Sequence, residues 1–137
     1  PCCAQYGVGV VAYSPLARGV LSGKYAPDAA PPEDSRAARK DRRLMQTEFR
    51  AESMQLASRV VAHARDKGVT TTQLALGWVW NNRLVNGLIG GPRTLAQWQD
   101  YLDAVGKPFT AEEVKKLRAK KLTPQQVLAE RKKLGLK

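Results

Sequence analysis

LIGGPRTLAQWQDYL, residues 88–102, carries three structural signals one after another. Leu88 and Ile89 end an apolar run, as expected where a buried strand finishes. The two glycines that follow permit a tight turn, because glycine reaches backbone angles that side chains exclude. Pro92 has no amide hydrogen and cannot continue strand pairing. The stretch therefore predicts a buried strand, a turn and the start of a helix.

The helix expected after this turn has an N-terminal cap. Thr94 is a favoured N-cap residue, and Gln97, three positions later, completes a Thr-x-x-Gln capping box. Helical spacing places four apolar residues on one face, which we expect to be buried: Leu95, Trp98, Leu102 and Val105.

The same junction has the geometry that binds phosphate. Unpaired backbone N–H groups and the positive end of the helix would face the turn. Arg93 stands where its guanidinium could add a bidentate contact. The alternative interpretation is that the junction only connects a strand to a helix.

Length and composition fit one domain with a hydrophobic core, since the chain has 137 residues and 43% are apolar. No apolar run reaches the ~18 residues of a membrane span, and no signal peptide is visible. We therefore expect a cytoplasmic protein that does not enter a membrane. The only cysteines, Cys2 and Cys3, are adjacent and poorly placed for a disulfide, and His63 is the only histidine. We expect no metal site.

The net charge is +11, which would attract polyanions. Basic residues concentrate in RAARKDRR, residues 36–43, and in the tail from Lys115 onward. Two interpretations stay open, a solvated basic surface and a binding surface for nucleic acid or another polyanion. No nucleic-acid motif is present, and aromatic residues are not interleaved with the basic ones, so we do not expect a nucleic-acid partner.

The first predicted strand is Gly7–Tyr13, GVGVVAY, an apolar run typical of strands buried on both faces of a parallel sheet. The segment that leaves it contains two glycines and the cation Lys24, at the place where α/β proteins bind ligands. Residues 26–50 have no clear period. A loop of this length is either a binding loop or lid, or a disordered insertion.

A helix is predicted over residues 51–67, with Gly68 as its C′ residue. The Thr70-x-x-Gln73 capping box opens a second helix that runs to about Asn82. This helix is apolar on nearly every side, so we expect it to be deeply buried, with its two tryptophans in the core.

Leu84–Ile89 is the second predicted buried strand, and capped helices are expected to begin near Thr110 and Thr123. Strands that alternate with helices predict an α/β protein with parallel pairing through right-handed crossovers. Two strands do not form a stable sheet alone, so the sequence is expected to be part of a larger fold.

Three blocks of sequence resemble the aldo-keto reductase superfamily: YSPLARGVLSGKY at 13–25, PPEDSR at 31–36 and GPRTLAQWQD at 91–100. They occur in the order of the family, with two helices between the second and third. The resemblance runs from about Tyr6 to about Glu113 and is closest to the branch that includes the potassium-channel β-subunit-like reductases.

The resemblance implies a (β/α)₈ TIM barrel, of which this chain is the C-terminal portion. It would supply the last two strands, seven and eight, with their helices, and would be incomplete as a barrel on its own. Residues 1–113 would be the C-terminal part of an NADP-dependent oxidoreductase domain, and residues 114–137 a basic helical tail.

The resemblance also implies an NADP(H) site. The residues along the cofactor's pyrophosphate, ribose and phosphates would be Ser14, Pro15, Leu16, Ala17, Arg18, Lys24 and Arg36. Those at the adenosine end would be Gly91, Arg93, Gln97 and Asp100. Arg93 would be able to reach the 2′-phosphate. Tyr101 departs from the family pattern, because many relatives have an adenine-contacting Asn there.

The implied chemistry is hydride transfer from a nicotinamide to an aldehyde or ketone. The family's catalytic Asp, Tyr, Lys and His belong to the earlier half of the barrel, so we assign no catalytic residue here and do not expect activity from this segment alone. Tyr13 and Lys24 match positions on the cofactor side.

Two other functions stay open, a polyanion-binding protein and a module that assembles with a missing N-terminal barrel half through exposed strand edges. The carbonyl substrate, the preference between NADPH and NADH, and the oligomeric state are not determined by the sequence.

Overall fold

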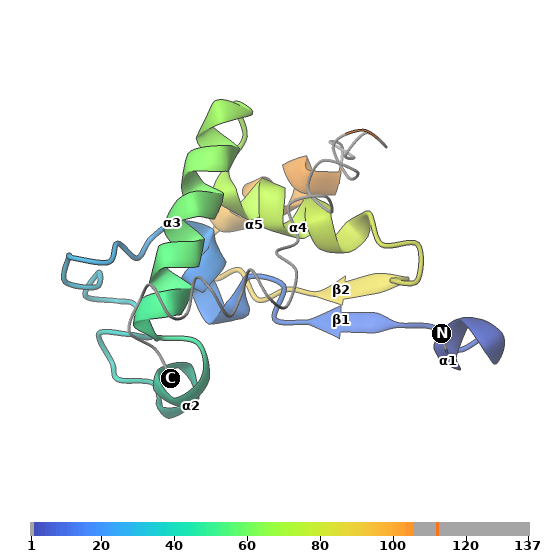
Figure 1. Cartoon of the computed structure of the whole chain (residues 1–137), viewed down its shortest axis with the longest axis horizontal. Helices are drawn as coiled ribbons and strands as arrows, with labels where there is room; N and C mark the ends of the chain where they lie inside the picture. Colours follow the sequence, from blue (N-terminus) through green and yellow to red (C-terminus); the bar gives the residue numbers. More distant parts are fainter. Residues whose placement is uncertain (1, 106–111, 113–137) are drawn as a thin grey trace, which may run out of the picture.

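The computed structural model describes residues 2–105 and Glu112. Its two strands are β1 (Val11–Tyr13) and β2 (Gly87–Ile89). The helical elements, in chain order, are α1 (Cys2–Gln5), the 3₁₀ segment η1 (Ala17–Ser22), α2 (Arg42–Thr47), α3 (Ala51–Asp66), α4 (Thr71–Trp80) and α5 (Leu95–Val105). Figure 1 shows α4 and α5 on one side of the strand pair and α1 beyond its end.

The two strands pair in parallel, as predicted. Their register joins Val11 to Gly87 and Tyr13 to Ile89. Both strands are shorter than expected, because the Asn86 side chain replaces a ladder bond at their entrance. The backbone N–H of Val10 donates to Oδ1 of Asn86 at 2.8 Å, while Asn86 N donates to the Val10 carbonyl at 2.8 Å. Regular pairing therefore begins only after Val10.

The prediction that both strands are buried on two faces is wrong for the described chain. Val11 is 58% exposed, Tyr13 72% and Ile89 60%. The physical reason is the small size of the sheet. With two strands and helices on one side, the other face and the outer edges have no further strand against them among the described residues.

Helices α3 and α4 confirm the capping predictions. Gly68 follows α3 with a φ of 66°, a left-handed angle suited to glycine. At the start of α4, the Gln73 N–H donates to Thr70 Oγ1 at 3.0 Å, and the Thr70 N–H donates to Gln73 Oε1 at 3.4 Å. This is the predicted capping box. Local sequence therefore fixed both helix boundaries to within two residues.

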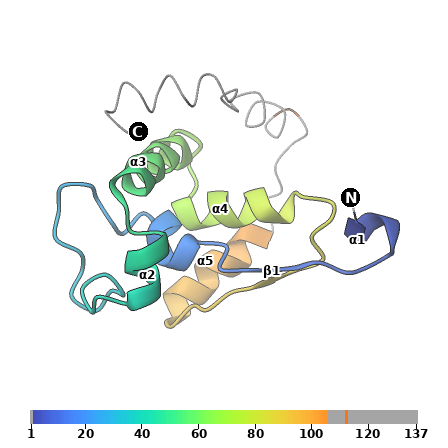
Figure 2. The same cartoon turned by 60° about the horizontal axis from the view of Figure 1, so that its bottom comes forward.

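Burial along α4 follows the prediction only in its first two turns. Residues 71–77 are all buried. Trp78 and Trp80 are 43% and 42% exposed, so their expected place in the core is wrong. Of the described elements, α3, α5 and η1 pack against α4, and its last turn extends past α3 and η1 (Figure 2).

Helix α5 presents the opposite face from the one predicted. The four residues expected to be buried are between 51% and 84% exposed: Leu95, Trp98, Leu102 and Val105. Instead, Ala104 is buried, and Asp100 and Tyr101 are partly buried. Periodicity shows which residues share a face, but not which face meets a neighbour. Here a hydrogen bond from Thr70 Oγ1 to Asp100 Oδ1, 2.6 Å long, holds the polar face toward the start of α4.

The long loop between η1 and α3 is ordered and contributes to the core, which contradicts the alternative of a disordered insertion. It contains α2, a helix that the sequence analysis did not predict. The Asp41 side chain caps α2 by accepting from Leu44 N at 2.9 Å. Leu44 is fully buried in a cluster with Val20, Tyr25, Ala37, Met54 and Ala57. The short α1 was not predicted either.

Several expectations fall outside the described residues or concern simple absences. The helices expected near Thr110 and Thr123, and the basic tail of residues 114–137, lie outside residues 2–105 and 112. Cys2 and Cys3 are both free. Within the described part of the chain, no helix has the length and apolar character needed to cross a bilayer.

Leu44→Ala tests the role of α2 in the core. It removes a side chain with no exposed surface, so we expect the free energy of unfolding to fall by about 2–5 kcal/mol. Urea denaturation followed by circular dichroism measures the change. Leu56→Ala, at a position 58% exposed on α3, is the matched control and should change stability by less than about 0.5 kcal/mol. Equal effects of the two substitutions would contradict this account of the core.

Candidate functional site

A cleft of about 840 Å³ lies at the carboxyl ends of the two parallel strands. Tyr13 and Ile89, the last residues of β1 and β2, line it together with the segments that leave them. Parallel α/β sheets bind ligands at this end of their strands, because the departing loops converge there. The cleft is therefore the candidate functional site.

Ten of the eleven residues expected at a cofactor line this one cleft. They are Ser14, Pro15, Leu16, Arg18, Lys24, Arg36, Gly91, Arg93, Gln97 and Asp100. Ala17 belongs to the same segment but does not line the cleft. Residues separated by more than 70 positions in sequence are thus brought to one concave surface by the pairing of two short strands.

The segment after β1 has an unusual backbone. Ser14, Ala17 and Arg18 have φ angles of 52°, 46° and 55°, although none is glycine. Left-handed angles cost non-glycine residues of order 1 kcal/mol or more each, and such strain gathers at functional sites. Tight backbone hydrogen bonds hold this path, including Ala17 N to Ser14 O at 2.9 Å. The segment is therefore fixed in a conformation that local sequence does not favour.

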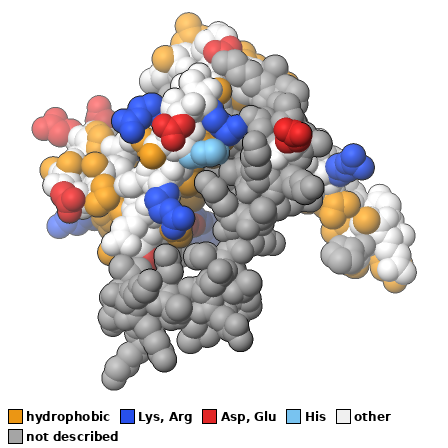
Figure 3. All heavy atoms as spheres, turned by 45° about the horizontal axis from the view of Figure 1, so that its top comes forward, with side chains coloured by type: hydrophobic (Ala, Val, Ile, Leu, Met, Phe, Trp, Pro, Cys, Tyr) orange, Lys and Arg blue, Asp and Glu red, His pale blue; other side chains and the backbone are white. Residues whose placement is uncertain are grey.

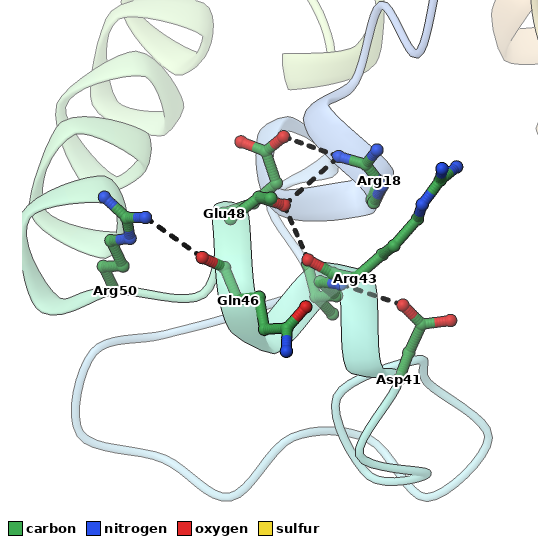
Figure 4. A network of polar contacts seen from close by, with 8 residues as sticks. Arg18, Asp41, Arg43, Gln46, Glu48 and Arg50 are labelled. Carbon is green, nitrogen blue, oxygen red and sulfur yellow. Dashed lines mark hydrogen bonds and ion pairs between the residues drawn. The ribbon is translucent and has the colours of Figure 1, made fainter.

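Arg18 joins this segment to α2. Its Nη1 lies 2.7 Å from Glu48 Oε1 and 3.3 Å from Thr47 Oγ1. Figure 4 shows the Arg18 guanidinium turned toward Glu48 at the end of α2. The charge of Arg18 is thus compensated within the protein, and its role at the cleft is mainly to join two of the walls.

Lys24 lies against Gly19, where the chain passes very close. A Cβ on Gly19, which has a φ of 98°, would stand 2.9 Å from Lys24 Nζ. The same ammonium is 5.1 Å from the centroid of the Tyr25 ring, within reach of a cation–π interaction. Tyr25 is in turn buried edge-on against Phe49. These contacts hold the Lys24 ammonium at the wall of the cleft.

The start of α5 differs in one bond from the predicted capping box. Thr94 Oγ1 accepts from Gln97 N at 3.3 Å, as predicted, but Gln97 Oε1 accepts from Arg93 N at 2.7 Å instead of from Thr94 N. The backbone N–H of Arg93 is therefore engaged within the protein. The N–H groups of Leu95 and Ala96 lie in the first turn, where a helix offers no carbonyl partner.

The Arg93 side chain closes one side of the cleft. Its Nη2 donates to the Asp34 carbonyl at 3.1 Å, across 59 positions of sequence. The bond ties the turn after β2 to the long loop before α2. A guanidinium has five N–H donors, so this single bond leaves most of its donor capacity for other acceptors.

Asp100 and Tyr101 form the wall on the α5 side. Asp100 Oδ1 accepts from Thr70 Oγ1, which positions the carboxylate against the start of α4. The Tyr101 ring packs on Gly90, where a Cβ would lie 2.4 Å from Cε1. Burial raises the pKa of Tyr101, the Asp100 charge adds to this rise, and a hydrogen bond with the Gly91 backbone opposes it. The phenol therefore stays neutral at physiological pH. Any stability that depends on the neutral form is fully present below the ordinary pKa of tyrosine and is lost as the pH rises through the raised pKa.

Three arginines that the sequence analysis assigned only to a basic cluster also line the cleft: Arg39, Arg42 and Arg43. Together with the expected residues they give seven basic side chains and two acidic ones, Asp41 and Asp100, on the lining. The signal that could have found them is the Asp41 cap, which starts α2 and directs Arg42 and Arg43 from its first turn.

The gathering of cations at the cleft contrasts with the face in Figure 3. There the Lys and Arg side chains stand singly, with acidic and apolar side chains among them. His63 is not among the lining residues. In the described part of the chain, no three His, Cys, Asp or Glu side chains come together as a metal site would require.

Comparison with known proteins decides the family. The model of the aldo/keto reductase family matches residues 1–121, which is most of the chain. The chain belongs to the aldo/keto reductase family. The resemblance found in the three sequence blocks is thereby confirmed.

Two relatives illustrate the family match. The chain is 32% identical to a probable voltage-gated potassium channel subunit beta of Arabidopsis thaliana, over 77% of this chain and 32% of that one. The structure of a glycerol dehydrogenase from Gluconobacter oxydans matches with a TM-score of 0.62 and 26% identity, over 85% of this chain and 35% of the other. The TIM-barrel fold of the family accounts for the parallel strands with flanking helices, which agree with part of such a barrel.

A third similarity is of a different kind. A 41-residue segment, 29% of the chain, is 83% identical to cytochrome c-552 of Thermus thermophilus and covers 31% of that protein. This chain has no Cys-x-x-Cys-His sequence, because its only cysteines are adjacent. The shared segment therefore carries no motif for covalent haem attachment. The chain spans about a third of the length of all three relatives.

Gly90→Ala tests the packing of the Tyr101 wall. The new methyl group would overlap the ring, so we expect a loss of stability of about 1–3 kcal/mol. Gly91→Ala is the matched control, because nothing lies within 4 Å of a Cβ there and its φ is not left-handed. Thermal unfolding of the two variants measures the difference. Adding Tyr101→Ala to Gly90→Ala should remove most of the penalty, and a penalty that persists would contradict the proposed contact.

Proposed function

We propose that this chain is the C-terminal, cofactor-binding segment of an NADP(H)-dependent aldo-keto reductase that reduces aldehydes or ketones. In this proposal β1 and β2 are strands seven and eight of the barrel. The observation that carries it is the convergence of the expected cofactor residues on one basic cleft at the carboxyl ends of two parallel strands.

The cleft suits a dinucleotide phosphate in its chemistry. Lys24 and Arg36 offer cations on the β1 side, and the start of α5 offers first-turn N–H groups, both of which favour phosphate. Arg93 is exposed and retains donors beyond its bond to Asp34, so it can contact a 2′-phosphate. This arrangement favours NADPH over NADH.

The remaining assigned residues would act mainly by shape and orientation. Ser14 to Arg18 would follow the pyrophosphate and ribose with a backbone held rigid by its own hydrogen bonds. Gln97 and Asp100 each use a side-chain oxygen within the protein, on Arg93 N and Thr70 Oγ1. We therefore expect them to orient the adenosine end with their other atoms. When bound, the nicotinamide would supply the hydride.

The chain's residues would bind and orient the cofactor and would not donate the proton to the substrate oxygen. Tyr13 ends β1 beside the cleft and is 72% exposed, and Lys24 packs against Gly19. Among residues 2–105 and 112, no hydrogen bond or ion pair joins the Tyr13 hydroxyl or the Lys24 ammonium to another group. We propose that the catalytic groups belong to the earlier part of a complete barrel, and that the substrate is a small carbonyl compound.

A second candidate function is assembly with the rest of a barrel, and the exposed strand faces favour it. Val11, Tyr13 and Ile89 leave apolar surface uncovered, as does the outer face of α5. One relative is named as a probable voltage-gated potassium channel subunit beta, and the word subunit indicates that this relative assembles with other chains. The two functions are compatible, because a cofactor cleft at the strand ends would be completed by the missing strands.

The division of the chain is also a proposal. Residues 1–113 would be the reductase segment, and residues 114–137 a separate basic tail. The family model, which matches residues 1–121, supports the reductase assignment of the first segment.

Titration of the chain with NADPH and with NADH, followed by tryptophan fluorescence, tests the cofactor proposal. We expect saturable NADPH binding that Arg93→Ala weakens about 10- to 100-fold, the size of one lost charged contact, with a much smaller effect on NADH. The comparison with NADH separates the 2′-phosphate contact from the lost bond to Asp34.

Arg59→Ala is the matched control, because it removes the same charge from an exposed position on α3 outside the cleft. It should leave both affinities unchanged. Equal weakening by both substitutions, with a steep dependence on salt, would instead identify non-specific polyanion binding. Absence of any binding to a folded chain would contradict the cofactor proposal.

A further inference from the structure

The cleft holds more cations than the proposed cofactor site uses. Lys24, Arg36 and Arg93 are assigned to the cofactor, and Arg18 is neutralised by Glu48. Arg39, Arg42 and Arg43 line the same cleft and have no assigned role. All three are exposed, and no acidic side chain of the described residues lies within ion-pair distance of them.

The backbone brings these three arginines to one place. Asp41 N donates to the Arg36 carbonyl at 2.9 Å, and Lys40 N donates to the Ala37 carbonyl at 3.0 Å, which makes a compact turn. Lys40 takes a left-handed φ of 51° in this turn, and its side chain is not on the cleft. The turn contains Arg39, and Arg42 directly follows it, so both line the same concave surface.

Helix α2, which carries Arg42 and Arg43, is held in place at both of its ends. Leu44 is fully buried beneath α2, and Asp41 caps the helix. At its other end, Glu48 pairs with Arg18 of η1 at 2.7 Å. Figure 4 shows the Arg43 side chain extending away from this network, with no interaction drawn to its guanidinium. Guanidinium groups on a fixed platform lose less freedom when they bind, which favours a specific site over a loose basic surface.

The two acidic side chains on the lining, Asp41 and Asp100, leave a large excess of positive charge from the seven basic ones. Asp41 Oδ1 accepts from Leu44 N, and Asp100 Oδ1 accepts from Thr70. A concave surface with a strong excess of one sign of charge attracts an oppositely charged ligand and concentrates it. Arginine pairs with phosphate in a bidentate way, so the group best matched to these three side chains is a doubly charged oxyanion.

We propose that Arg39, Arg42 and Arg43 form a second oxyanion subsite of the cleft, which takes a phosphate-type group in addition to the phosphates of the cofactor. The inference rests on the proposed function only in assigning Lys24, Arg36 and Arg93 to the cofactor. The phosphate group could belong to a phosphorylated substrate or to a free anion. Either would be held by the same chemistry.

Isothermal titration of the full chain with inorganic phosphate, at constant ionic strength set by chloride, tests this subsite. We expect saturable binding that the double variant Arg42→Ala/Arg43→Ala weakens at least about tenfold, which is the effect of losing charged contacts. Arg59→Ala should leave phosphate affinity unchanged. Loss of affinity by the same factor in Arg59→Ala, or no phosphate binding by the unaltered chain, would overturn the proposal.

A second arm repeats the phosphate titration with NADPH at saturation. An unchanged phosphate affinity shows that the two sites are separate, as proposed. Competition between phosphate and NADPH, with equal weakening of both by Arg42→Ala/Arg43→Ala, would assign the arginines to the cofactor and overturn the second subsite. If NADPH does not bind, the phosphate titration without NADPH still tests the phosphate subsite. The cofactor proposal and the subsite proposal can therefore be rejected separately.

Two further variants control for disturbance of α2 and for the loss of positive charge alone. Arg39→Ala lies outside α2, so it tests the subsite even if the double variant disturbs that helix, which circular dichroism reports. Arg42→Lys keeps the charge but loses the planar fork, and should recover only part of the affinity. The last comparison measures the affinity of the chain for an aldehyde with and without a phosphate group. If the phosphorylated aldehyde binds more tightly, and Arg39→Ala removes that difference, the substrate is the source of the phosphate.

Discussion

The cleft depends on one constraint, the parallel pairing of two three-residue strands. The register of β1 against β2 aligns their carboxyl ends, and everything proposed to bind a ligand leaves from those ends. The pairing is set at its entrance by Asn86, whose side chain accepts from Val10 N while its own backbone N–H donates to the Val10 carbonyl. A slip of one residue would turn every side chain of the strand to the opposite face and separate the two halves of the cleft.

The walls of the cleft are then joined by polar contacts between distant segments. Arg18 pairs with Glu48, Arg93 donates to the Asp34 carbonyl, and Thr70 donates to Asp100. Exposed ion pairs and single hydrogen bonds contribute only about 0–1.5 kcal/mol each to stability. Their main effect is to fix positions, since each one limits the movement of a loop that carries basic side chains.

The described chain leaves apolar surface uncovered in two places, the strand pair and the outer face of α5. On the proposal that β1 and β2 belong to a complete barrel, neighbouring strands would cover the strand pair. Hydrophobic burial supplies about 25 cal/mol per Å² of apolar area, so these surfaces represent stabilisation that the chain does not obtain from its own described residues. The core around Leu44 shares no residue with these two surfaces.

The sequence by itself determined the bounds of α3 and α4, the parallel pairing and ten of the residues that converge on the cleft, because these follow from local hydrogen bonding, from the alternation of strands with helices and from similarity over whole blocks. The Thr70 capping box is an example, since its donors and acceptors lie within four residues. Tertiary structure decided which face of α5 packs inward, because Asp100 accepts a hydrogen bond from Thr70 while Trp98 stays 51% exposed. It also decided that Arg42 lines the cleft, because that depends on the burial of Leu44 against residues far away in sequence.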